Sequence, residues 1–114
     1  MSRYDVIIIG AGPGGIFAAY ELAKKAPELK VAVFEAGNSL EKRKCPIDGK
    51  KIKSCINCKT CAIMSGFGGA GAFSDGKYNI TNDFGGTLYE YIGKDTAIDL
   101  MKYVDEINLA YGGE

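Results

Sequence analysis

A glycine-rich stretch directly after a short apolar run constrains the fold of this chain most. Residues 4–9 form a β-branched run typical of a buried strand, and residues 10–15 then read Gly-Ala-Gly-Pro-Gly-Gly. Residues 14–25 carry apolar side chains at helical spacing, and a second apolar run follows at 31–34. This order of elements predicts a βαβ unit over residues 4–35, with two parallel strands and a right-handed crossover.

The glycines match the pattern G-x-G-x-x-G in the strand–turn–helix context that this pattern requires. Gly10 allows the tight turn, Gly12 lets the backbone approach a pyrophosphate, and Gly15 lets the helix pack closely on the sheet. Amides of the first helical turn bind phosphates. Glu35, at the end of the second strand, can accept hydrogen bonds from a ribose and disfavours the 2′-phosphate of NADP. The alternative is a plain glycine turn with a surface acid, but the complete context favours a dinucleotide.

The composition indicates one cytoplasmic globular domain. Lys+Arg and Asp+Glu both number 14, so the chain has no broad basic field for nucleic acid. No apolar run approaches the roughly 20 residues that span a bilayer, and the N-terminus is not a secretory signal. We therefore expect neither a nucleic-acid partner nor a membrane. In the cytoplasm, clustered cysteines favour metal or redox roles over disulfides.

All the cysteines fall in one short window, at Cys45, Cys55, Cys58 and Cys61, and the chain has no histidine. Three interpretations stay open: a four-cysteine zinc or iron–sulfur site, redox-active thiols activated by neighbouring lysines, or a solvated insert with inert thiols. The spacing fits neither metal class cleanly. Ferredoxins usually place Cys-Pro after the cysteine triple, and zinc usually takes two separated C-x-x-C knuckles.

Beyond the βαβ unit we distinguish a Cys/Lys-rich insert at 38–64 and a Gly-rich tract at 66–79. The insert has no sustained periodicity. The tract is loop-like, with a short strand expected at 78–81. Its glycines allow close approach to a planar or anionic ligand, and its successive amides can form an anion-binding nest. The alternative is a space-filling connector, and the residues alone do not decide between the two.

The last segment is amphipathic, with apolar side chains recurring at helical spacing. We predict a helix over about 95–111, with Thr96 and Asp99 at its start in a capping arrangement and glycines at its end.

Three stretches resemble known flavoproteins. The opening YDVIIIGAGPGGIFAAYEL is similar to the N-terminus of two-dinucleotide-binding-domain flavoproteins, which place FAD on their first βαβ unit. RKCP at 43–46, the tract GFGGAGAFSDGKYN and the ending VDEINLAYGG resemble the uncharacterised bacterial FAD-dependent dehydrogenase family. Members of that family are several times longer. The resemblance therefore implies an α/β, Rossmann-like FAD-binding unit with a cysteine-containing insert. Residues 1–114 would be the N-terminal part of the FAD-binding domain, an incomplete fragment of a larger flavoprotein.

The resemblance also implies FAD rather than NAD at this site, and a full-length FAD-dependent oxidoreductase whose small-molecule substrate and catalytic residues are not identified. NAD(P) would bind in the missing part, and the fragment alone would be inactive. The residues that it implies at the cofactor are Gly10, Gly12, Pro13, Gly14, Gly15, Glu35, Ala36, Arg43, Lys44, Gly69, Ala70, Gly71, Ser74 and Lys77. The alternatives are an NAD-dependent dehydrogenase domain and a four-cysteine metal-binding interaction module with a degenerate nucleotide site.

Overall fold

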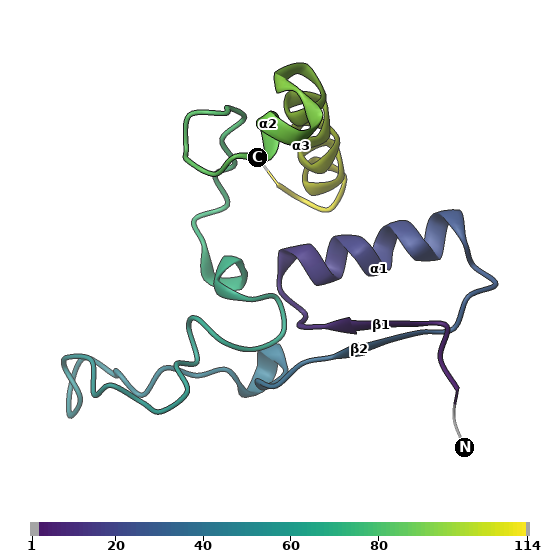
Figure 1. The fold of residues 1–114 in the computed structure, drawn as a ribbon. Coiled ribbons are helices and arrows are strands. Elements are labelled where there is room, and N and C mark those ends of the chain that lie inside the picture. The colour runs from purple at the N-terminus through teal and green to yellow at the C-terminus, as the bar shows by residue number, and fades with distance from the viewer. Residues whose placement is uncertain (1–2, 114) are drawn as a thin grey trace. The chain divides into compact units, whose positions relative to one another are not determined.

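The computed structural model describes residues 3–113 and divides the chain into two compact units, Met1–Ser74 and Asp75–Glu114 (Figure 1). The first unit contains both strands and one long helix. The second contains two helices. The predicted α/β fold class is confirmed.

The first unit is built on a βαβ motif. Strand β1 spans Val6–Ile9, helix α1 spans Pro13–Lys25 and strand β2 spans Val31–Phe34. The two strands pair in parallel, from Val6 opposite Val31 to Ile9 opposite Phe34, and lie side by side beneath α1 in Figure 1. The βαβ prediction is confirmed. The first strand begins at Val6 and not at the predicted residue 4.

Helix α1 packs on the sheet through its first turn. A Cβ atom added to Gly15 would collide with the Gly10 carbonyl oxygen and come within 3.2 Å of Ile8 Cγ2. The turn before the helix depends on Gly10, whose φ of 98° is one that side chains other than glycine rarely adopt. The Gly10 N–H donates to the Phe34 carbonyl at 2.7 Å, so the loop stays tied to β2 where β1 ends.

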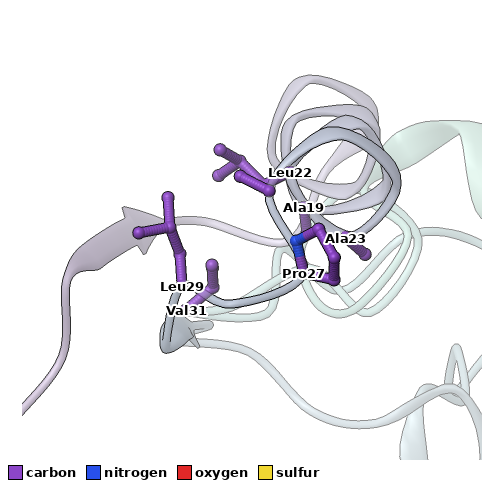
Figure 2. A pocket seen from close by; sticks show the side chains of 7 residues that line it. Ala19, Leu22, Ala23, Pro27, Leu29 and Val31 are labelled. Atoms are coloured by element: carbon purple, nitrogen blue, oxygen red, sulfur yellow. The ribbon is translucent and has the colours of Figure 1, made fainter.

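The two-stranded sheet has one face under α1 and one face whose side chains, among residues 3–113, are exposed. Ile7 and Ile9 point to this exposed face, and Ile9 is 81% exposed. At the far end of α1 a second apolar surface forms a hollow of about 270 Å³, lined by small and branched side chains (Figure 2). Leu22, Leu29 and Val31 line this hollow, which offers a ligand no charged side chain.

Residues 35–74 contain only two short 3₁₀ helices, η1 at Leu40–Lys42 and η2 at Ala70–Phe73. The chain leaves the βαβ motif, makes an extended excursion and returns to the glycine loop (Figure 1). The return is fixed by backbone hydrogen bonds from Phe67 N to the Asn38 oxygen at 3.0 Å and from Gly68 N to the Ala11 oxygen at 2.7 Å.

The second unit contains helix α2 at Leu88–Ile92 and helix α3 at Lys94–Ala110. Helix α3 confirms the predicted C-terminal helix. The predicted cap is wrong, because Gly93 occupies the N-cap with φ of 82° and α3 starts ahead of Thr96. The strand predicted at 78–81 is also wrong: these residues form no strand, and no described strand pairs with them. Within residues 3–113, none of the helices combines the length and apolarity needed to cross a bilayer.

The first prediction concerns Gly15. Replacing Gly15 with Ala should lower the free energy of unfolding by roughly 1–3 kcal/mol, because the new methyl group overpacks the contact between helix and loop. Urea denaturation measures this change. Gly14→Ala is the matched control, since a Cβ atom at Gly14 meets nothing within 4 Å. The control should change stability by less than about 1 kcal/mol. Equal effects of the two substitutions would contradict the packing role of Gly15.

Candidate functional site

The glycine loop leaves open space in front of the first turn of α1. Gly12 is the N-cap residue, without a side-chain cap, and Pro13 follows in the first turn. A Cβ atom on Gly12 or Gly14 would meet no protein atom within 4 Å. First-turn amides lack acceptors inside a helix, and they carry the positive end of the helix dipole. The loop therefore presents donors and positive potential to an anion that could approach closely.

Glu35 lies beside this loop, directly after β2. Its Oε2 accepts a hydrogen bond from Ala11 N at 2.7 Å, and its Oε1 accepts one from Gly37 N at 2.8 Å. The amides of Gly37 and Ala11, and to a lesser extent the Arg43 charge, hold the pKa of the Glu35 carboxyl below its ordinary value. The carboxylate is thus ionised at neutral pH. Each oxygen keeps acceptor capacity for a further donor.

A pocket of about 310 Å³ joins the loop to Glu35. This volume is at the small end for ligand sites and suits part of a dinucleotide. The predicted residues Gly12, Glu35, Ala36 and Gly69 come together in its lining. Gly66, which belongs to the predicted Gly-rich tract, also lines it, whereas sequence reasoning missed Gly37, Thr60, Met64 and Ser65.

The far side of the pocket comes from residues 62–69, which we call the wall segment. Gly69 of this segment has a φ of 62°. A Cβ atom added to it would lie 3.2 Å from Gly12 Cα and from Pro13 Cδ. This approach and the positive φ both favour glycine at residue 69. The wall segment ends at η2, where a Cβ atom on Gly71 would lie 3.9 Å from Pro13 Cγ. The structure therefore seats the predicted Gly-rich tract against the glycine loop.

The other predicted cofactor residues are placed differently. Lys44 is exposed and does not line the pocket, and Ala70 belongs to η2. Ser74 is the C-cap of η2. Lys77 lies in the second unit, where its ammonium is 3.8 Å from Asp75 Oδ2. Cofactor contacts by these residues stay predictions.

Arg43 is buried, with 3% of its surface exposed. Its Nε donates to the Ala62 oxygen at 2.8 Å and its Nη2 to the Ile63 oxygen at 2.8 Å. Its Nη1 donates to the Phe67 oxygen at 2.7 Å and to the Gly69 oxygen at 2.9 Å. The predicted direct contact between Arg43 and a cofactor has no support in this geometry, since the side chain is directed at the wall segment.

The cysteines do not converge. All four are exposed and unbonded to one another, and no three Cys, Asp or Glu side chains among the described residues group closely enough to hold a metal ion. The predicted four-cysteine site is not formed in this structure. Residues 45–61 contain no helix or strand to bring the thiols together, and their order comes from local turns. In one of these, Asn57, with φ of 53°, donates its N–H to Cys55 Sγ at 3.4 Å.

Comparisons with known proteins match the region around the glycine loop. Residues 1–41 match the Thi4 family. A thiamine thiazole synthase of Yarrowia lipolytica is 64% identical over 33 residues, which is 29% of this chain and 10% of that protein. The corresponding synthase of Candida albicans is 54% identical over 35 residues, covering 31% of this chain and 10% of the relative.

A longer match reaches an uncharacterized protein of Clostridium beijerinckii, 39% identical over 71 residues, or 62% of this chain and 13% of that protein. The chain thus spans about a tenth of the length of the curated relatives it matches. No solved structure matches it. These findings assign the N-terminal region to Thi4-like sequence. Membership of the bacterial FAD-dependent dehydrogenase family stays a prediction.

The second prediction concerns the pH dependence of Glu35. Its pKa is lower in the folded chain than in the unfolded chain, so its stabilising contribution is complete above the ordinary glutamate pKa of about 4.3. That contribution is lost as the pH falls through the lowered pKa. The stability difference between wild type and Glu35→Gln should therefore be largest near neutral pH and should shrink on acidification. Urea denaturation from pH 7 to pH 3 measures it. A stability difference that does not change with pH would show that the two amides do not stabilise the ionised form of Glu35.

The third prediction concerns the thiols. A thiol reagent added to the native protein should react with all 4 cysteines, because each is exposed. Neither a denaturant nor a chelator should raise that number. Thiols that become reactive only after the chelator is added would show that the insert holds a metal after all.

Proposed function

We propose that this chain is the FAD-binding N-terminal portion of a flavin-dependent oxidoreductase. The observation that carries the proposal is the single pocket in which the ionised Glu35 and the open glycine loop lie together. The donors of the glycine loop suit an anionic pyrophosphate, and the Glu35 carboxylate suits a pair of ribose hydroxyls.

Different groups of the pocket bind the pyrophosphate and the ribose of the ADP moiety. The first turn of α1 provides amides and positive potential for the pyrophosphate, and Gly12 leaves room for it. The Glu35 carboxylate accepts the 2′- and 3′-hydroxyls of the adenosine ribose, while the Ala11 and Gly37 amides hold its orientation. A 2′-phosphate would meet this charge at close range, so NADP is excluded.

When bound, FAD supplies hydride and electron transfer, and the protein contributes binding, orientation and electrostatics. The residues of this chain hold the adenosine end and the pyrophosphate. None of the described side chains is assigned to the reacting end. We assign no residue of this chain to the substrate or to acid–base catalysis, and we propose that other parts of the whole protein supply both.

The relatives support the binding mode more than the reaction. The family match covers residues 1–41, which include the glycine loop, and the relatives in Yarrowia lipolytica and Candida albicans carry the name thiamine thiazole synthase. Sharing this segment supports a shared adenine-dinucleotide site. NAD is the competing ligand, because it presents the same ADP moiety to the same residues.

The fourth prediction tests this proposal by isothermal titration with FAD, NAD, NADP and ADP. FAD and ADP should bind, and NADP should not. Glu35→Gln should weaken ADP binding by about 10- to 100-fold, because a charge-assisted hydrogen bond to the ribose is lost. Glu28→Gln, which removes an exposed acid in the turn before β2, is the matched control and should leave affinity unchanged.

The ligand series separates the alternatives. Binding of NAD with no binding of FAD would replace the flavin assignment with the nicotinamide one. Failure of ADP itself to bind would overturn the dinucleotide site, because ADP carries every group that this pocket is proposed to recognise.

A further inference from the structure

Arg43 is the most buried charged side chain among the described residues, yet no carboxylate oxygen accepts any of the hydrogen bonds the structure gives it. Four of its five N–H groups donate to main-chain carbonyls, and these carbonyls belong to Ala62, Ile63, Phe67 and Gly69. Burial of a guanidinium is costly unless its donors are satisfied. Here one side chain satisfies four acceptors of a segment that has no sheet or long helix to satisfy them.

The carbonyls that accept from Arg43 lie next to residues that line the pocket. The carbonyls of Ala62, Ile63 and Phe67 flank residues 64–66, which line the same pocket as Glu35. The fourth carbonyl belongs to Gly69, which also lines the pocket. Arg43 therefore fixes the wall segment at points on both sides of its ligand-facing residues.

The packing behind the wall leaves no space for another arrangement. A Cβ atom on Gly66 would collide with Arg43 Cδ and lie 2.7 Å from Arg43 Nε. A Cβ atom on Gly37 would lie 2.5 Å from Gly66 Cα. Gly37 also donates its N–H to Glu35. The Arg43 side chain, Gly66, Gly37 and Glu35 thus form a continuous series of contacts from the buried guanidinium to the pocket.

The guanidinium also has little means of reaching a phosphate. The Phe73 ring covers it, with the ring centroid 4.8 Å from Cζ. Bidentate recognition of a phosphate needs two free parallel N–H groups. The hydrogen bonds to the wall leave one N–H, on Nη2.

We propose that Arg43 is a positioning residue for the adenosine half of the dinucleotide: it does not contact the ligand, and it holds the wall segment at the distance from Glu35 and Gly12 that the ligand requires. This inference rests on the proposed function. It differs from the direct cofactor contact that the family resemblance implies for Arg43.

The fifth prediction compares Arg43→Lys with wild type by titration with ADP at several salt concentrations. Lysine keeps the charge, but its compact ammonium cannot span four carbonyls. Affinity should fall about tenfold or more, because the wall loses its anchors. The salt dependence of binding should stay as in wild type, because the charge that screening would affect does not face the phosphates. Lys42→Met, which removes an exposed neighbouring charge, is the matched control and should bind as wild type does.

A second readout needs no ligand. Hydrogen–deuterium exchange of Arg43→Lys should quicken across residues 62–69 and stay unchanged in α1. If Arg43→Lys does not fold, Phe73→Leu takes its place, since it leaves every hydrogen bond of Arg43 possible and removes only the covering ring. It should weaken ADP binding about two- to fivefold and quicken exchange in the same segment.

Three outcomes would overturn the proposal: ADP affinity retained in Arg43→Lys, exchange unchanged across 62–69, or a reduced salt dependence, which would mean that the guanidinium meets a phosphate directly. If Phe73→Leu carries the test, unchanged ADP affinity or unchanged exchange across 62–69 would overturn it equally. The two proposals fail separately. If wild type does not bind ADP, the proposed function fails, and the exchange measurement still decides whether Arg43 holds the wall.

Discussion

The candidate site depends on the close approach of two glycine-containing backbones. Gly68 N donates to the Ala11 oxygen at 2.7 Å, and a Cβ atom added to Gly69 would lie 3.2 Å from Gly12 Cα and Pro13 Cδ, closer than ordinary van der Waals contact. Since the first backbone belongs to the βαβ motif and the second follows a long excursion, this contact closes the pocket. The positive φ of 62° at Gly69 gives the second backbone a conformation that other residues rarely adopt.

Two charged side chains hydrogen-bond main-chain groups that, in a sheet, would bond to a neighbouring strand. Glu35 accepts hydrogen bonds from the amides of Ala11 and Gly37, and Arg43 donates to four carbonyls of the wall segment. Both side chains satisfy main-chain groups. The charge of Arg43 also lowers the pKa of Glu35. A loop-built site is thereby ordered by charge-assisted hydrogen bonds. Replacing either ion by an uncharged residue leaves main-chain groups with weaker partners or none.

Local patterns predicted the βαβ motif, helix α3 and the place of Glu35, because hydrophobic period and turn residues act over a few positions. The wall of the pocket depends on contacts between residues far apart in sequence, such as that from Arg43 to Gly69, and no local pattern marks Thr60 or Met64 as lining residues. The cap at Thr96 was wrong because Gly93, in a conformation suited to glycine, starts the helix earlier. The four cysteines do not converge among the described residues, because spacing alone names candidate ligands, whereas convergence requires a scaffold and residues 45–61 contain no helix or strand.

The family match covers the glycine loop but not the wall segment. The Thi4 match ends at residue 41, just before Arg43 and well before the wall segment. The matched part therefore contains the glycine loop and Glu35, for which we propose recognition of the ADP moiety common to many dinucleotides. The wall that completes the pocket lies outside it, and Thr60, which contributes to the lining, stands between Cys58 and Cys61. The cysteine-containing insert thus contributes Thr60 to the pocket lining and none of its cysteines. On the proposed function, selectivity beyond ADP depends on the pocket residues between 60 and 69, which lie outside the family match.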